Sequence, residues 1–115
     1  SPDGSALFVV ESENHKIRRV EVATGEMAAL AGGGEAGDAD GVGDAAQFDG
    51  PAGIAISPDG GALFVADFTG HKIRRVEVAT GSVTTIAGSG AGGDTDGVDE
   101  ASEFFYPRGI AISPD

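Results

Sequence analysis

A chain of 115 residues, 40% of them hydrophobic, is long enough for one domain with an apolar core. Seven basic against nineteen acidic residues give a net charge of −12, which argues against a nucleic-acid partner because such affinity comes largely from Lys and Arg. No apolar run approaches the length of about 18 residues that a membrane span requires. The absence of Cys excludes disulfides and thiolate metal sites and does not indicate a compartment.

The sequence is a tandem repeat with a spacing of 56 residues. The stretch HKIRRVEVATG occurs at 15–25 and again, without a change, at 71–81. Residues 1–56 and 57–112 align without a gap and differ at 22 positions, and residues 113–115 repeat the first three letters once more. No Met precedes the first residue, so we expect a fragment or a processed product. Internal periodicity of this length indicates a repeat architecture.

The first two predicted elements of each repeat are strands. The run ALFVVE at 6–11 is apolar at both odd and even positions, which is typical of a strand that is covered on both faces. KIRRVEVA at 16–23 predicts the next strand. Its apolar residues do not share one parity, so we predict a bulge near Arg18–Arg19.

The next segment of the repeat requires a choice between helix and strand. EMAALAG at 26–32 is rich in Ala and alone would favour a helix, but its counterpart SVTTIAG at 82–88 is β-branched. Because two copies of one unit share a fold, we predict a strand in both. GIAI at 53–56 predicts a last short strand, and the Pro and Gly of SPDG at 57–60 favour a tight hairpin after it.

Four strands in a repeat of about fifty residues are typical of a β-propeller blade. PAGIAISPDGGALFVADFTGHKIRRVEVATGSVTTIAG at 51–88 resembles an NHL repeat, in the version whose long loop reads GxxGxxDGxxxAxxFxxPxGIA. The chain has GEAGDADGVGDAAQFDGPAGIA at 34–55 and GAGGDTDGVDEASEFFYPRGIA at 90–111. The resemblance implies an all-β chain of two propeller blades, each of four antiparallel strands. Families with this repeat often have six blades and include scaffolds for protein or RNA binding and a few lyases.

The phase of the repeat predicts association between copies. Residues 1–31 supply three strands of one blade, 51–88 a complete blade, and 107–112 one strand that matches the first strand missing from 1–31. Open strand edges and apolar blade faces need partners. We therefore predict head-to-tail association by strand exchange, with a homotrimer closing a six-bladed ring. Eight blades would require four chains, and a dimer that packs its open faces together is the competing arrangement.

Two pairs of carboxylates are the weak metal candidates. Asp38 and Asp40, and again Asp94 and Asp96, are spaced by one residue and precede a Gly, as in calcium loops. The third oxygen ligand and the distal Glu of such loops are absent, so a turn held by side-chain hydrogen bonds to the backbone is the favoured interpretation. We expect no cofactor and retain Ca²⁺ as the weaker alternative.

An aromatic and basic cluster is the main candidate for a binding site. Phe105, Tyr106 and Arg108 stand where the first copy has Asp, Gly and Ala, and side chains of this kind are enriched at interfaces. The cluster predicts a protein or peptide recognition patch, with a seal between chains as the alternative. Phe48 and Phe104, present in both copies, are expected to anchor the loops in the core.

Each repeat also carries a carboxylate four residues before a histidine, Glu11 with His15 and Asp67 with His71. Such a pair could be a catalytic dyad or half of a metal site, but its presence in every repeat favours hydrogen bonds that fix a turn. The arginines of the two IRR stretches could form a basic stripe, but we expect them to pair with nearby Glu or Asp or to cover apolar neighbours: Arg18, Arg19, Arg74 and Arg75.

No catalytic constellation is recognisable in the sequence, and the glycine-rich stretches lack the Lys of a phosphate-binding loop and resemble flexible loop. The sequence therefore favours a non-enzymatic propeller module that self-assembles and offers its loops to a protein or peptide. The alternative is part of a metal-assisted propeller lyase or hydrolase.

Overall fold

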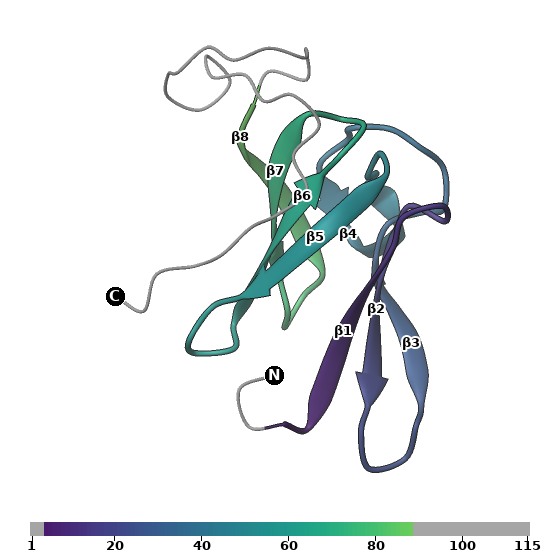
Figure 1. The fold of residues 1–115 in the computed structure, drawn as a ribbon, viewed down its shortest axis with the longest axis vertical. Helices are drawn as coiled ribbons and strands as arrows, with labels where there is room; N and C mark the ends of the chain where they lie inside the picture. The colour runs from purple at the N-terminus through teal and green to yellow at the C-terminus, as the bar shows by residue number, and fades with distance from the viewer. Residues whose placement is uncertain (1–3, 89–115) are drawn as a thin grey trace.

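A computed structural model of the chain describes residues 4–88, which form two antiparallel β-sheets and no α-helix (Figure 1). The first sheet has the strand order β1-β2-β3 and consists of β1 (Ala6–Glu11), β2 (Lys16–Glu21) and β3 (Met27–Ala31). The second sheet has the order β4-β8-β7-β6-β5 and consists of β4 (Gly41–Val42), β5 (Pro51–Ile56), β6 (Ala62–Asp67), β7 (Lys72–Glu77) and β8 (Ser82–Ala87). One turn of 3-10 helix, η1, spans Gly43–Ala45.

The strand predictions for residues 4–88 are confirmed. The Ala-rich stretch forms strand β3 rather than a helix, as its β-branched counterpart in β8 indicated. The predicted bulge is present in both copies, because the register shifts between Ile17 and Arg18 and between Ile73 and Arg74. The predicted strand at 107–112 lies outside the described residues.

The SPDG stretch forms the hairpin between β5 and β6 through local hydrogen bonds. The amide of Gly60 donates to the carbonyl of Ser57 at 2.9 Å, and Gly60 has a φ of +76°, which glycine adopts without strain. The Asp59 carboxylate accepts the Ser57 hydroxyl at 2.6 Å and the Gly61 amide at 2.9 Å, and these bonds hold its pKa below the usual value. The hairpin brings two apolar strands into register.

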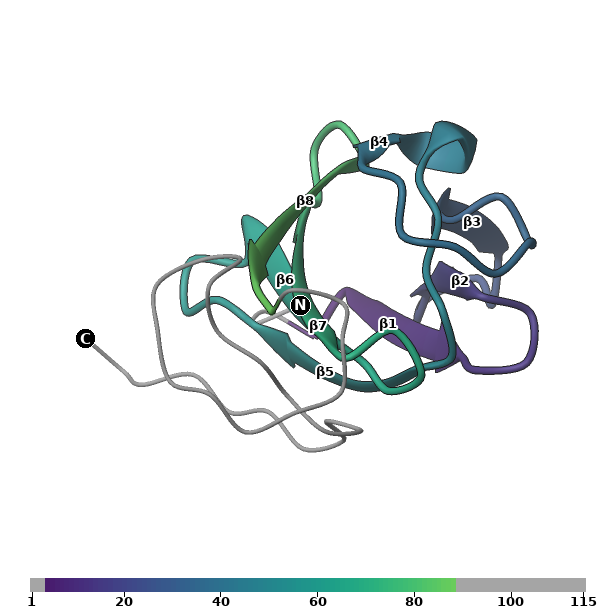
Figure 2. The ribbon, with the colours of Figure 1, turned by 90° about the horizontal axis from the view of Figure 1, so that it is seen from above.

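The core lies between the two sheets, which lie side by side with β1 next to β5 (Figure 2). Its fully buried side chains come from both sheets and from the long connection between them, and include Ile17, Phe48, Leu63, Val65 and Val76. Phe48 is completely buried, so its predicted role as a loop anchor is confirmed, whereas Phe104 lies outside the described residues. The packing of one blade against the next therefore supplies the core.

The connection between the sheets differs from its prediction as a flexible loop. Residues 41 and 42 form strand β4, which pairs with the outer edge of β8 in the second sheet, Gly41 opposite Val83 and Val42 opposite Ser82. The amide of Gly43 also donates to the carbonyl of Gly81 at 2.9 Å. A strand of two residues has no periodicity, so the sequence pattern could not reveal it. The first repeat thus extends the blade of the second.

The described residues contain no helix that is both long and apolar enough to cross a membrane.

Candidate functional site: the arginine anchor between repeats

Arg74 on β7 anchors the connection between the two sheets, which we call the inter-repeat loop (residues 32–50). Its side chain is completely buried. One terminal nitrogen, Nη1, donates to the Gln47 carbonyl at 2.7 Å and to Asp67 Oδ2 at 3.2 Å. The other, Nη2, donates to the Ala39 carbonyl at 3.0 Å and to Asp40 Oδ1 at 2.9 Å. One guanidinium therefore fixes two separate stretches of the loop against the blade.

The surroundings of Arg74 explain why a charged group is tolerated in the core. The guanidinium carbon lies 5.3 Å from the centre of the Phe48 ring, within range of a cation–π interaction. Four of its contacts are to carbonyl or carboxylate oxygens, and only Nε is buried without a partner. Because a buried ion pair gains little net stability over apolar packing, this arrangement chiefly specifies how the loop docks.

Asp67, the carboxylate partner of Arg74, is itself completely buried. Burial raises its pKa to about 6, whereas the Asp49 amide, which donates to Asp67 Oδ1 at 3.0 Å, and the charge of Arg74 act in the opposite direction. Ionised Asp67 is the form that pairs with Arg74. The carboxylate therefore joins three segments: the end of β6, strand β7 and the inter-repeat loop.

The two candidate metal ligands of the first copy contact cations of β7. Asp38 Oδ2 accepts a hydrogen bond from Lys72 Nζ at 2.9 Å, which keeps the pKa of Asp38 below its usual value. Asp40 Oδ1 accepts from Arg74 and from the hydroxyl of Thr85 at 3.0 Å. Residues 4–88 hold no group of three or more His, Cys, Asp or Glu side chains that could bind a metal ion. These contacts give the DADG stretch a role in docking the loop.

The two other candidate ligands, Asp94 and Asp96, lie outside the described residues, as do Phe105, Tyr106 and Arg108. The calcium and recognition hypotheses for these five residues stay predictions. Their positions in the repeat can be located through the first copy. Asp94 and Asp96 correspond to the pair that contacts β7, and 105–106 correspond to Asp49 and Gly50 at the rim described next.

Residues 49–51 form a rim segment held between the turn that joins β1 to β2 and the turn that joins β6 to β7. Gly50 donates its amide to His15 Nδ1 at 3.0 Å, and Ser12 donates its hydroxyl to the Pro51 carbonyl at 2.6 Å. The Asp49 carbonyl accepts the amides of Thr69 and Gly70 in the second turn. The rim is therefore a fixed surface at which both turns and the inter-repeat loop meet.

In the first copy the predicted pairing of the turn histidine with the carboxylate four residues before it is wrong. His15, with a φ of +55°, accepts the Gly50 amide and so holds the rim segment. Glu11 instead pairs with Arg18 at 3.1 Å, and Asp67 pairs with Arg74. His71 has the same φ of +55°.

The prediction that the four arginines pair with carboxylates is confirmed. Arg19 contacts Glu21 at 2.7 Å on β2, and Arg75 contacts Glu77 on β7. Together with the Arg18 and Arg74 pairs, these contacts account for both IRR stretches. The special position of Arg74 as a loop anchor was missed. A signal for it was present in the sequence: both copies of the repeat contain the acidic stretch DxDGV and the basic stretch HKIRR, whose charges are opposite.

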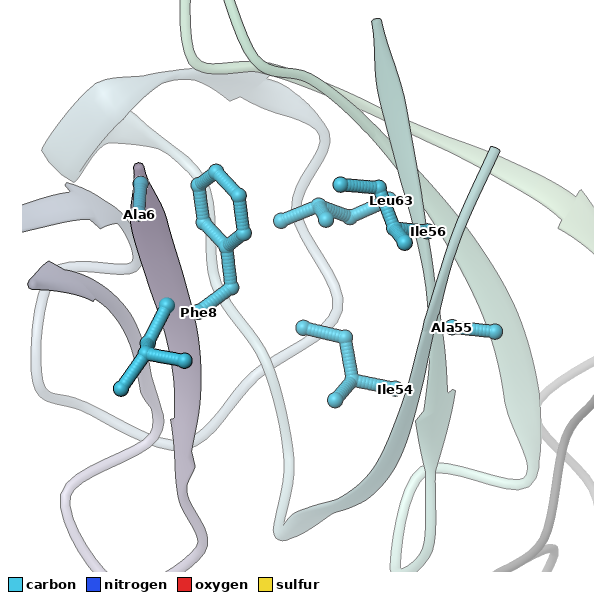
Figure 3. A pocket seen from close by; sticks show the side chains of 7 residues that line it. Ala6, Phe8, Ile54, Ala55, Ile56 and Leu63 are labelled. Atoms are coloured by element: carbon cyan, nitrogen blue, oxygen red, sulfur yellow. The ribbon is translucent and has the colours of Figure 1, made fainter. Parts of the chain in front are cut away.

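An apolar cavity of about 160 Å³ lies between β1 and β5 (Figure 3). Phe8 of β1 points across it toward Leu63 and Ile56 of the second sheet, and Ile54 forms its lower part in the view. No acid, base or nucleophile lines it; the lining residues are Ala6, Leu7, Phe8, Ile54, Ala55, Ile56 and Leu63. Its chemistry suits an aliphatic side chain.

The fold and this junction define a class: two consecutive blades of a β-propeller, the second complete and the first with three strands. Solved structures of such proteins superpose closely. An auxiliary nutrient binding protein from Bacteroides ovatus ATCC 8483 matches with a TM-score of 0.82 and 27% identity over 96% of this chain and 30% of its own. Another from Bacteroides thetaiotaomicron VPI-5482 matches with a TM-score of 0.81 and 26% identity, with the same coverage.

Comparison with curated proteins finds homologues, although no family model matches the chain. Protein SUPPRESSOR OF QUENCHING 1, chloroplastic, from Arabidopsis thaliana is 39% identical over 97% of this chain and 11% of that protein. NHL repeat-containing protein 2 from Homo sapiens is 36% identical over 94% of this chain and 16% of that protein. The chain thus spans less than a fifth of the curated relatives it matches. It is homologous over nearly its whole length to NHL-repeat proteins, which confirms the resemblance to NHL-type propeller repeats.

Proposed function

We propose that the chain is a non-enzymatic propeller module that associates head to tail with copies of itself and presents its loops to a protein or peptide. One observation carries the association. Leu63 and Val65 in the second sheet are 1% and 0% exposed, whereas Leu7 and Val9 at the same repeat positions are 57% and 41% exposed. The first sheet covers the face of the second sheet that carries Leu63 and Val65. The equivalent face of the first sheet, which carries Leu7 and Val9, is exposed, and another blade could cover it in the same way.

Strand exchange is the route that this association would take. Residues 107–112, PRGIAI, differ from β5, PAGIAI, at one position, and β5 pairs with β6 in the complete blade. Strand β1, the counterpart of β6, forms the edge of its sheet among the described strands. Residues 107–112 of a second copy would add to β1 as β5 adds to β6, and their isoleucines suit the apolar cavity beside it.

A ring of six blades is the closure that we propose, which makes the assembly a homotrimer. The chain covers 30% of each of the two nutrient-binding structures, close to the third that two of six blades would occupy. Closure by rotation would pair the open edge of β1 and cover the open blade faces. Interfaces of this obligate kind bury about 2,000 Å² or more.

The recognition surface is proposed at the rim. Phe105 and Tyr106 correspond to the rim positions Asp49 and Gly50, which are held between two turns, and Arg108 corresponds to Ala52 next to the rim on β5. Aromatic and Arg side chains on such a fixed surface are favourable for binding a protein or peptide. Peptides selected from a displayed library on the assembled protein should lose at least about tenfold in affinity in Tyr106→Ala and Arg108→Ala. Equal binding by these variants and the parent chain would remove the rim as the site.

Light scattering tests the association directly. A mass three times the chain mass of 11.4 kDa supports the trimer, and a monomer at all concentrations refutes it. Val9→Asp, which places a charge on the open face, should dissociate the trimer. Ala23→Asp, in the exposed turn between β2 and β3, is the matched control and should leave the mass unchanged. Circular dichroism of both variants verifies that the sheets have formed.

A further inference from the structure

The second sheet shows how a repeat holds the loop of the repeat before it. The segment 38–42, DADGV, contacts β7 through its two carboxylates, Asp38 with Lys72 and Asp40 with Arg74. Its last two residues form β4 on the outer edge of β8. The contact thus combines two ion pairs with a short antiparallel strand.

The first sheet carries the same receiving groups. Lys16 and Arg18 occupy on β2 the repeat positions of Lys72 and Arg74 on β7, and Arg18 lies opposite Val9 just as Arg74 lies opposite Val65. Among the described residues Arg18 pairs only with Glu11, and its side chain is 25% exposed. Arg74 is 0% exposed. Arg18 therefore occupies the same position as Arg74, but among the described residues no loop is bound to it.

The edge of β3 shows the same difference. In the second sheet β4 covers the edge of β8, and Val83 is 1% exposed. In the first sheet β3 is the outermost strand of those described, and Met27, the counterpart of Val83, is 55% exposed. An apolar side chain next to an open strand edge favours the addition of another strand.

We propose that Lys16, Arg18 and the outer edge of β3 form a docking site for residues 94–98 of a second copy. This segment, DTDGV, differs from the docked DADGV at one position, and there the docked segment contributes only its main-chain carbonyl to Arg74. Two cations face two carboxylates, so the charges are complementary. The site rests on the proposed head-to-tail association and names the second contact, after strand exchange, through which copies engage.

The register of β4 on β8 gives the site a disulfide test. Val42 lies opposite Ser82, so Val98 of one copy would lie opposite Glu26 of the other, at a distance that a disulfide can bridge. The chain has no Cys. We would mix Glu26→Cys chains with Val98→Cys chains under mild oxidation and expect a disulfide-linked pair of chains. Val42→Cys with Ser82→Cys in one chain is the positive control. Glu13→Cys, in the turn before β2, mixed with Val98→Cys is the negative control.

Charge reversal sharpens the test. Arg18→Glu in the Glu26→Cys chain should lower the rate of cross-linking about tenfold, because it removes an attraction and adds a repulsion. Asp96→Arg in the Val98→Cys chain should restore the rate, which a general loss of structure would not allow. A rate that does not respond to either substitution overturns the assigned anchor.

Three outcomes separate this site from the proposed assembly. Cross-linking no faster than in the negative control, in a chain whose mass is that of a trimer, overturns the docking site and leaves the head-to-tail ring. Specific cross-linking in assemblies that are not trimers supports the site and overturns closure with three chains. A monomer that does not cross-link overturns both.

Discussion

The two sheets have nearly the same strands and very different environments. Leu7 and Leu63 occupy one repeat position, yet their exposed fractions are 57% and 1%. The first arginines of the two IRR stretches differ in the same way, since Arg18 is 25% exposed and Arg74 fully buried. The difference comes from the neighbour: the second sheet packs on the first sheet and its loop, whereas the described residues place no blade on the other side of the first.

Burial in this protein is thus a property of a junction between repeats. Each repeat supplies strands, an apolar sheet face and a loop. The apolar face and the loop become buried only where they pack against a neighbouring repeat. Substitutions at equivalent positions in the two sheets should therefore have unequal effects on stability. Stability differences between such pairs belong to the isolated chain, so they are measured at concentrations below those at which copies associate.

The largest difference is expected between Arg74→Ala and Arg18→Ala. Loss of Arg74 leaves Asp67 buried without its cation and frees two carbonyls of the loop, so the free energy of unfolding should fall by about 3 to 5 kcal/mol. Loss of Arg18 breaks one partly exposed pair with Glu11 and should cost about 1 kcal/mol or less. Urea denaturation measures both. Equal losses would contradict the role of Arg74 as the loop anchor.

A slightly smaller contrast is expected for the leucines. Leu63→Ala leaves a cavity in the core and should lower the free energy of unfolding by about 3 kcal/mol. Leu7→Ala removes a side chain that is largely exposed and should change it by no more than about 0.5 kcal/mol. When copies associate, Leu7→Ala should become costly as well, because the proposed neighbour covers it. A persistent small effect in a trimer would argue against that cover.

Strand positions could be predicted from the sequence because they depend on local pattern. The apolar run at 6–11, the change of parity at Arg18 and the SPDG turn each reflect chemistry that a few neighbouring residues determine. The anchor could not be predicted in this way. Arg18 and Arg74 lie in identical stretches, so only the three-dimensional contact distinguishes them, and β4 is too short to show a pattern.

A pH-dependent difference should follow from Asp67. Burial raises the pKa of its carboxyl group to about 6, above the value of 3.8 for an unperturbed group. Between about pH 4 and 6 the folded state then binds a proton that the unfolded state has lost. The free energy of unfolding should therefore decrease as pH rises through this window, by up to about 3 kcal/mol.

Carboxyl carbon chemical shifts in NMR spectra measure this pKa, and Asp67→Asn should remove the corresponding part of the pH dependence. The charged groups that face Asp67, Arg74 and the Asp49 carboxylate, are present in both proteins. In Arg74→Ala the pKa of Asp67 should rise further, since the cation that lowers it is gone. Titration of Asp67 below its unperturbed value would contradict the dominance of burial.

The smallest effect concerns a single hydroxyl that only the second sheet possesses. Thr85 donates to Asp40 Oδ1 at 3.0 Å, whereas its counterpart in β3 is Ala29. Thr85→Ala should lower the free energy of unfolding by about 1 kcal/mol more than Thr84→Ala, which has the same change in strand propensity at an exposed neighbouring position.

Ala29→Thr is the reverse change, made on β3 of the first sheet. It should leave the isolated chain unaffected but, if residues 94–98 dock on β3 as proposed, slow the dissociation of copies about fivefold, because Asp96 would gain the donor that Asp40 has. Equal dissociation rates with and without this hydroxyl would place Asp96 away from β3, even in a chain that assembles.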